Sequence, residues 1–205
     1  MLQTNTQFFK PSQLFRSLSI LEAVSRDSGV TQKTLARETY MSEAMVNQYI
    51  RDLQTQGILE LKSVNKKQFL YSLTRQGQEL RLNLQDRYCS EMVQFLNKLK
   101  QRIRDSLSEL IQKKSCPVAL LGATEECELV LQILRQDTNS TIVALADPNP
   151  EKQGQNLQGK VIISPEKLSS VHFDYLVVAS FNGQELTRST TEHVPGNKEF
   201  KTLKI

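Results

Sequence analysis

The stretch from Thr31 to Gly57 constrains the fold most, because it holds the start and stop signals of two short helices around a tight turn. Thr31 and Ser42 are each suited to cap a helix, since a hydroxyl there accepts a hydrogen bond from a first-turn N–H. Gly57 ends the second helix, where the left-handed conformation costs glycine least. In that helix, spacings of four and three align one apolar stripe: Val46, Ile50 and Leu53. The pattern predicts a helix-turn-helix, with an ordinary helical hairpin inside a larger core as the alternative.

The face of the second helix opposite that stripe carries short or fork-shaped side chains that can form hydrogen bonds. Such side chains can pair with base edges in the major groove of DNA. The residues expected to contact bases are Ser42, Ala44, Asn47, Gln48 and Arg51. Two cations of the preceding helix, Lys33 and Arg37, are expected to contact phosphates.

Two alternating segments follow these helices and predict a β-hairpin, which takes the position of a wing. Segments 59–61 and 69–73 each alternate apolar with polar residues, and the basic polar run 63–67 can turn the chain between them. Lys66 and Lys67 in that run are expected to lie against a phosphate backbone or in a minor groove.

From about Leu14 to Gly77 the chain resembles the winged-helix domains of bacterial MarR-like regulators, including small regulators associated with exopolysaccharide gene clusters. The matching segments are TQKTLAR at 31–37, the spaced Val46, Ile50 and Leu53 with the following GIL, and LTRQG at 73–77. The resemblance covers about a third of the chain and is more specific for a winged helix than for any subfamily. It implies a DNA-binding transcriptional regulator with a winged helix-turn-helix over 11–75.

Charge is divided unevenly along the 205 residues. Residues 1–114 carry 18 basic and 11 acidic side chains, a net charge of +7, while residues 115–205 carry 8 and 11, a net charge of −3. A basic first part and an acidic second part suit a polyanionic partner, double-stranded DNA, for the first part only. We expect no membrane association and no secretory signal, because no apolar run reaches eighteen residues and the start lacks a basic region followed by an apolar one. Three cysteines without a CxxC pair indicate the cytoplasm rather than a disulfide framework or a zinc site.

Before the helix-turn-helix, an amphipathic helix is predicted from Ser12 to about Asp27. Its expected buried stripe is Leu14, Leu18, Leu21 and Val24.

After the hairpin, residues 75–113 contain no proline and one glycine, which predicts a long helix, assigned to 76–114, that Thr74 caps. Apolar or thiol side chains recur in it every seven residues, as in a coiled coil: Leu82, Cys89, Leu96, Ile103 and Leu110. We therefore expect a homodimer that pairs through residues 82–110. The alternatives are a long helix packed on its own C-terminal domain, or two helices with a break.

Residues 115–205 predict a small parallel sheet with helices on both faces. Strands are expected at 117–122, 141–146, 160–163, 175–179 and 199–205, and helices at 126–135, 165–168 and 182–193. The predicted fold class is thus α/β with two domains: a winged helix-turn-helix, a long connecting helix, and a small Rossmann-like parallel sheet.

Ligands of such sheets bind beyond the carboxyl ends of the strands. The candidate ligand-binding residues there are Gly122, Ala123, Thr124, Asp147 and Ser180. A dinucleotide fingerprint would need two further glycines where Thr124 and Cys127 stand, so conventional NAD binding is not expected. Cys127 could be a redox-sensing thiol or could fill the space of a lost glycine.

Segments of 117–181 resemble the small Rossmann-like domain at the front of nucleotide-sugar and polysaccharide-biosynthesis enzymes, and the whole layout is similar to that of Rex-type redox-sensing repressors. The matching segments are GATEECELVLQIL, IVALADPNPEKQGQNLQGKVIISPEKL and FDYLVVAS. The resemblance implies a nucleotide-like or nucleotide-sugar-like ligand, and the chain departs from the family pattern in lacking the later glycines.

No catalytic residue, metal site or resident cofactor is predicted, because neither histidine stands in a nucleophile or metal-binding spacing. The sequence therefore favours a dimeric DNA-binding transcriptional regulator with a sensor domain. The alternatives are a ligand-free oligomerisation or partner-binding module after the same DNA-binding domain, and an enzyme acting on activated sugars.

Overall fold

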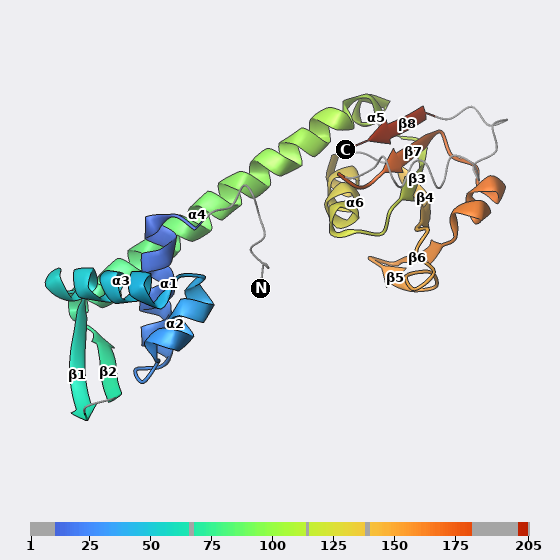
Figure 1. Ribbon diagram of the computed structural model, residues 1–205. Helices are drawn as coiled ribbons and strands as arrows, with labels where there is room; N and C mark the ends of the chain where they lie inside the picture. Colours follow the sequence, from blue (N-terminus) through green and yellow to red (C-terminus); the bar gives the residue numbers. More distant parts are fainter. Residues whose placement is uncertain (1–10, 66–67, 114, 138–139, 182–200, 205) are drawn as a thin grey trace. The chain divides into compact units, whose positions relative to one another are not determined.

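A computed structural model describes residues 11–65, 68–113, 115–137, 140–181 and 201–204 (Figure 1). The chain divides into two compact units, Met1–Gln94 and Phe95–Ile205.

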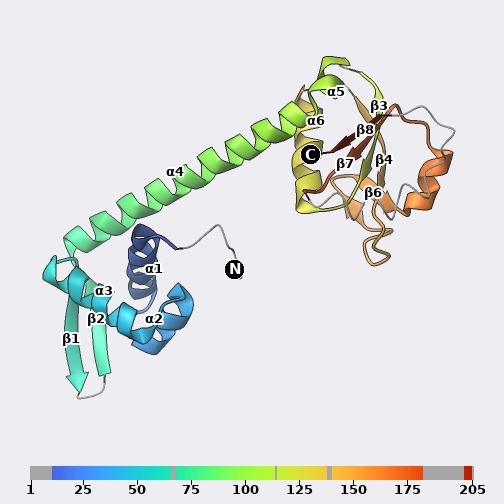
Figure 2. The ribbon, with the colours of Figure 1, turned by 45° about the horizontal axis from the view of Figure 1, so that its top comes forward.

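The N-terminal unit contains three helices followed by a two-stranded sheet. These elements are α1 (Gln13–Arg26), α2 (Gln32–Thr39), α3 (Glu43–Thr55), β1 (Leu59–Asn65) and β2 (Gln68–Leu73). The hydroxyls of Thr31 and Ser42 accept from the N–H groups of Thr34 and Met45 at 3.1 and 3.2 Å, which confirms both predicted caps. The strands pair in antiparallel fashion from Leu59 opposite Leu73 and follow α3 directly (Figure 2). This unit is a winged helix-turn-helix.

One apolar core joins these elements. Its buried residues include Leu18, Leu21, Val24, Leu35, Val46, Ile50, Leu53, Leu59 and Tyr71. The predicted stripe of α3 is therefore confirmed, and that of α1 is confirmed except for Leu14. Leu14 is 49% exposed, because it lies in the first turn of α1, beyond the residues of that helix that reach the core.

The long helix is shorter than predicted. Helix α4 (Arg75–Ser106) ends before Leu107, and a separate helix α5 (Ser108–Lys113) follows. Ile103, Leu107 and Leu110 are fully buried in the core of the C-terminal unit. The alternative of two helices with a break therefore describes this segment better than one continuous helix.

The predicted seam over residues 82–110 is accordingly not a single exposed surface. Leu82, Cys89 and Leu96 are exposed, whereas Ile103 and Leu110 pack inside their own unit and are not available to a second chain. A sequence period reports which residues share one side of a helix, and it cannot tell which part of that side the same chain covers.

The C-terminal unit is a six-stranded sheet in the order β5-β6-β4-β3-β7-β8. Its strands are β3 (Pro117–Leu121), β4 (Thr141–Ala146), β5 (Asn156–Leu157), β6 (Lys160–Ile163), β7 (Tyr175–Val178) and β8 (Lys201–Lys204). Every pair is parallel except β5 with β6, and β5 is the one strand that was not predicted.

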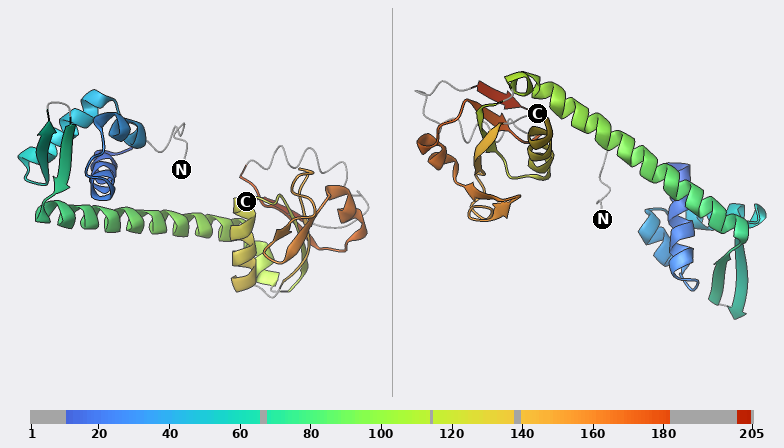
Figure 3. Two further views of the ribbon diagram at one scale, coloured as in Figure 1. Left: turned by 90° about the horizontal axis from the view of Figure 1, so that it is seen from below. Right: turned by 180° about the vertical axis from the view of Figure 1, so that it is seen from behind.

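Helix α6 (Glu125–Asp137) and the 3-10 helix η1 (Pro165–Ser170) lie on opposite faces of this sheet (Figure 3). Val130 and Leu134 of α6 share a core with Ile103 and Leu107, and Leu168 of η1 packs on the other face with Phe173. The predicted parallel sheet with helices on both faces is confirmed for these elements. The helix expected at 182–193 lies outside the described residues.

A close backbone contact joins the end of α3 to the start of α4 in the N-terminal unit. Thr74 donates its N–H to the Ile58 carbonyl at 3.1 Å and its hydroxyl to the Gly57 carbonyl at 2.7 Å. The same hydroxyl accepts from the Gly77 N–H at 3.0 Å, so Thr74 caps α4 as predicted. A Cβ at Gly77 would overlap the Ile58 carbonyl oxygen, which explains a glycine inside a helix.

We expect Gly77→Ala to lower the free energy of unfolding by about 1–3 kcal/mol, because the backbone of Ile58 or α4 must shift to admit the methyl group. The measurement is urea unfolding of the full chain followed by far-ultraviolet circular dichroism. Gly29→Ala is the matched control, since a Cβ there meets only ordinary contacts, and its effect should stay within about 0.5 kcal/mol. Equal effects of the two substitutions would contradict the steric argument.

Candidate functional site

Helix α3 turns a polar face to solvent. Ser42, Ala44, Gln48 and Arg51 are exposed, and Asn47 is partly exposed. All five predicted base-contacting residues are thus at least partly exposed. Ala44, Asn47, Gln48 and Arg51 share one side of α3 and Ser42 is the cap at its start; together they are defined here as the α3 face. An inward-facing polar surface would have excluded contact with a duplex.

Two members of the α3 face already have local partners. The Ser42 hydroxyl accepts from the Met45 N–H, and the Gln48 amide donates to Asp52 at 2.8 Å. In contrast, the guanidinium of Arg51 makes no hydrogen bond or ion pair within the described part of the chain. Its five donors suit bidentate pairing with guanine or phosphate.

The cations of α2 lie one helical turn apart and are exposed at Lys33 and Arg37. Because both side chains are exposed on α2, each can reach the phosphates of a polyanion. Lys66 and Lys67 of the predicted wing tip lie outside the described residues.

Two exposed residues near the α3 face were not predicted from the sequence. Met45 is 37% exposed on α3, and Tyr40 in the turn is 53% exposed with a positive φ of 54°. The apolar side chain of Met45 gives no signal for a polar interface. The conformation of Tyr40 could not be anticipated, because glycine or asparagine normally occupies such a position.

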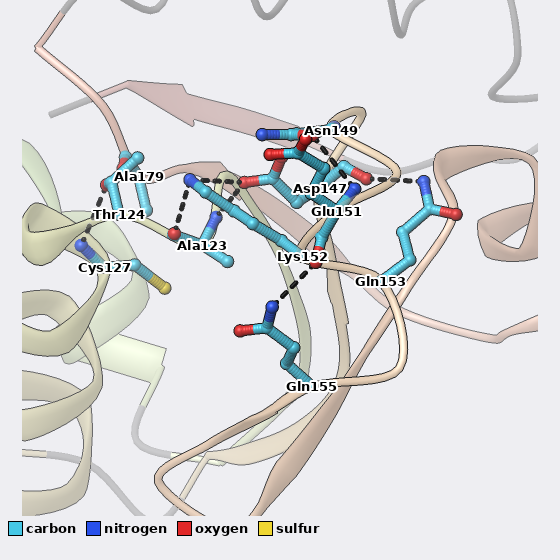
Figure 4. Close-up of polar contacts among 10 residues, drawn as sticks. All are labelled: Ala123, Thr124, Cys127, Asp147, Asn149, Glu151, Lys152, Gln153, Gln155 and Ala179. Atoms are coloured by element: carbon cyan, nitrogen blue, oxygen red, sulfur yellow. Dashed lines mark hydrogen bonds and ion pairs between the residues drawn. The ribbon is translucent and has the colours of Figure 1, made fainter.

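In the C-terminal unit, the predicted ligand residues follow the carboxyl ends of three strands, and Figure 4 draws Ala123, Thr124 and Asp147 among them. Gly122, Ala123 and Thr124 follow β3, Asp147 follows β4, and Ser180 follows β7. The expectation that these residues lie at one edge of the sheet is thus correct.

Asp147 is held by its own chain. The residue is 3% exposed, and its carboxylate accepts from the N–H groups of Ala123 at 2.7 Å and Asn149 at 2.8 Å. Lys152 lies 3.4 Å from it and also donates to the Ala123 carbonyl at 2.9 Å (Figure 4). A buried carboxylate requires such partners, because desolvation without them is costly. The arrangement therefore ties the β3 and β4 ends together and leaves little of the carboxylate for a ribose.

Thr124 bonds the residues that follow β3 to those that follow β7. Its hydroxyl donates to the Ala179 carbonyl at 2.8 Å and receives a long contact from the Cys127 N–H at 3.4 Å. A dinucleotide fingerprint places glycine here so that a pyrophosphate can approach the backbone. The first turn of α6 also contains Glu125, Glu126 and Glu128, whose charges oppose an anion at that helix end.

The Cys127 thiol is buried and protonated. Burial and, next, the charge of Asp147 raise its pKa to about 12. Reactive thiols have lowered pKa values and solvent access, and Cys127 has neither. The space-filling alternative therefore describes it better than a redox sensor.

Other candidate sites are few. No group of three potential metal-binding side chains occurs among the described residues, and no helix in them is long and apolar enough to cross a membrane. An open hollow of about 500 Å³ lies along α6, and none of the predicted ligand residues lines it. It is lined by Glu128, Leu129, Gln132, Arg135, Gln136 and Gln158.

Comparison with known proteins gives one family match in each unit. Residues 16–60 match the family model described as winged helix-turn-helix DNA-binding. This match lies within the N-terminal unit and agrees with its winged-helix fold. Residues 115–194 match the model described as C2185-like, N-terminal. No curated protein sequence matches the chain.

Several solved structures are similar over about half of the chain, at low identity. The PcaV transcriptional regulator from Streptomyces coelicolor, with its natural ligand, is 19% identical over 47% of this chain and 70% of its own, with a TM-score of 0.38. A MarR family protein from Mycobacterium tuberculosis, with salicylic acid, is 17% identical over 48% and 74%, with a TM-score of 0.38. ZitR from Lactococcus lactis, in complex with DNA, is 18% identical over 53% and 75%, with a TM-score of 0.37. Similarity at this level supports no conclusion about ligand or activity.

We expect Cys127 to resist thiol reagents while the chain is folded, because its thiolate is negligible at neutral pH and its sulfur is buried. A Cys89→Ser, Cys116→Ser double variant leaves Cys127 as the single thiol, so labelling with an aromatic disulfide reports on it alone. The same variant unfolded in urea is the control and should react at once. Prompt labelling of the folded variant would restore the redox-sensor hypothesis.

Proposed function

We propose that this chain is a transcriptional regulator that binds double-stranded DNA as a homodimer. The observation that carries the proposal is the α3 face, a solvent-exposed polar surface on the second helix of a winged helix-turn-helix. In this class of fold the second helix enters the major groove, where its outward side chains reach base edges. The cysteine pattern further suggests that the protein acts in the cytoplasm.

The contacts divide into two kinds. Ser42, Ala44, Asn47, Gln48 and Arg51 would contact bases in the major groove. Lys33 and Arg37 on α2, with Lys66 and Lys67 of the wing, would contact phosphates and hold the domain in register. The net charge of +7 over residues 1–114 supports this assignment.

Arg51→Ala is expected to weaken binding to the operator by about 1–3 kcal/mol and to relax sequence preference, because a bidentate contact with a base is lost. Lys33→Ala and Lys67→Ala should each reduce the slope of log K against log salt by about one, because one fewer phosphate is neutralised. Fluorescence anisotropy with labelled duplex at several salt concentrations measures both effects.

Lys98→Ala, an exposed cation of the C-terminal unit, is the charge-matched control and should bind as the wild type does. Wild-type affinity and salt slope in all three binding-surface variants would refute the assignment. A wild-type protein that ignores duplex DNA even at low ionic strength would refute the function itself.

Pairing of two chains is supported by α4. Several of its large side chains are exposed on the side of the helix that carries the seven-residue repeat: Leu82, Tyr88, Met92, Val93, Phe95 and Leu96. Contiguous apolar side chains of this kind mark an interaction surface in soluble proteins. A second copy of α4 would cover them and would give two α3 faces, as half-sites about one helical turn apart require.

Leu96→Lys should raise the dimer dissociation constant at least about tenfold, because an ammonium buried without a partner costs more than about 1.4 kcal/mol. Glu91→Lys introduces the same residue about 140° away around α4 and should leave the constant unchanged. Sedimentation equilibrium over a range of concentrations measures both. A monomeric wild-type protein, or equal effects of the two variants, would contradict pairing through this side of α4.

For the C-terminal unit we propose a Rossmann-like assembly or partner-binding module. The strand order β6-β4-β3-β7-β8 supports the Rossmann-like arrangement. When these parallel strands are numbered as they occur along the chain, the order is 3-2-1-4-5, as in that fold. The internal bonds of Asp147 and Thr124 support a module without a nucleotide ligand. A nucleotide-like or nucleotide-sugar-like ligand is the alternative, supported by the gathering of Gly122, Ala123 and Ser180 at the strand ends. The absence of a candidate nucleophile or base disfavours an enzyme.

Thermal unfolding separates these two possibilities, because a ligand that binds only the native state raises the melting temperature. We expect no change in Tm with NAD, nucleoside diphosphates or nucleotide sugars at concentrations far above ordinary dissociation constants. A reproducible rise that Asp147→Asn abolishes would favour the sensor instead.

A further inference from the structure

Tyr40 has a backbone conformation that tyrosine rarely adopts. It ends α2 with φ 54° and ψ 39°, in the left-handed region, and its N–H is bonded to the Ala36 carbonyl. Within the described part of the chain, the one other non-glycine residue with positive φ is Gln158. The turn requires this conformation, because it directs the next residue, Met41, into the core and places Ser42 as the cap of α3.

Neither local geometry nor packing explains why tyrosine stands there. Glycine fits the left-handed region without strain, and asparagine tolerates it better than a bulky residue does. Burial of the ring could offset the strain, yet Tyr40 is 53% exposed. Its hydroxyl makes no hydrogen bond to any residue that the structure describes. The turn needs the left-handed conformation but does not need a tyrosine there. Strain of this kind, which a glycine would avoid, is often retained for function.

The position of Tyr40 suggests which function. It precedes the Ser42 cap by two residues and so stands at the N-terminal end of α3, beside the α3 face. A recognition helix presents that end to the base edges, and the turn before it therefore lies near the sugar–phosphate wall of the groove. A phenol suits this wall, because its hydroxyl can donate to a phosphate oxygen and its ring can pack on deoxyribose.

We propose that Tyr40 is a DNA-contacting residue that binds the sugar–phosphate wall of the major groove. The inference rests on the proposed function and adds to it a contact that carries no charge. The salt dependence of binding distinguishes the Tyr40 contact from those of Lys33 and Arg37, because a neutral side chain releases no counterion and its loss leaves the salt slope unchanged.

The test uses Tyr40→Gly and Tyr40→Asn in the full chain, with a labelled mixed-sequence duplex of roughly 30 base pairs, enough for two half-sites. Both variants should weaken binding by about 10–150-fold, the loss typical of one hydrogen bond to a charged group, at the wild-type salt slope. Tyr40→Gly should also raise the Tm of the protein, since the strain is relieved. Affinity would then fall while stability rises.

Wild-type affinity in both variants would overturn the inference. So would a fall of Tm in both, because Tyr40 would then act by packing the turn. Arg51→Ala in the same assay separates a failure of the Tyr40 contact from a failure of the proposed DNA binding. If the wild type binds, Arg51→Ala weakens binding and the Tyr40 variants do not, this inference alone fails. If the wild type does not bind at low ionic strength, the proposed function fails.

Discussion

The bonds of Thr74 set the geometry of the N-terminal unit. Through its N–H and its hydroxyl, Thr74 satisfies carbonyl groups left open after α3, at Gly57 and Ile58, and it also caps α4. Carbonyl groups at a helix end need partners, and here the next helix supplies them. Gly77 allows the close approach, because any side chain would meet the Ile58 carbonyl. The direction of the α3 face is thus tied to the first turn of α4.

This connection gives α4 a functional meaning in the proposed regulator. Because the start of α4 is bonded to the residues that follow α3, a change in the proposed pairing of α4 would be passed to the position of the α3 face. The exposed apolar side chains of α4, such as Met92 and Leu96, are the surface on which such pairing would depend. Farther along, Ile103 and Leu107 belong to the core of the C-terminal unit and serve folding instead.

In the proposed assembly or partner-binding module, the residues at the strand ends bond to their own chain, and a fold by itself does not imply a ligand. Asp147 stands after β4, near where a ribose-binding acid belongs, but two N–H groups and Lys152 occupy it. In a region of low dielectric these bonds stabilise the strand ends, and breaking them for a ligand would leave buried groups without partners. The geometry accounts for an intact sheet without a nucleotide, and it leaves the α6 hollow as an open surface with no partner indicated.

Local signals in the sequence determined the helix-turn-helix, its caps at Thr31 and Ser42, the hairpin and most strands of the parallel sheet. Capping and periodicity depend on neighbours along the chain, so they can be recognised without the fold. Only the tertiary structure decided that α4 ends before Leu107, that Ile103 is buried and Leu14 exposed, that the Asp147 carboxylate is bonded by its own chain, and that Tyr40 has a left-handed backbone. The burial and the helix end depend on which distant segment packs against these residues, and the states of Asp147 and Tyr40 depend on the path of the folded backbone. A sequence pattern carries no information about either.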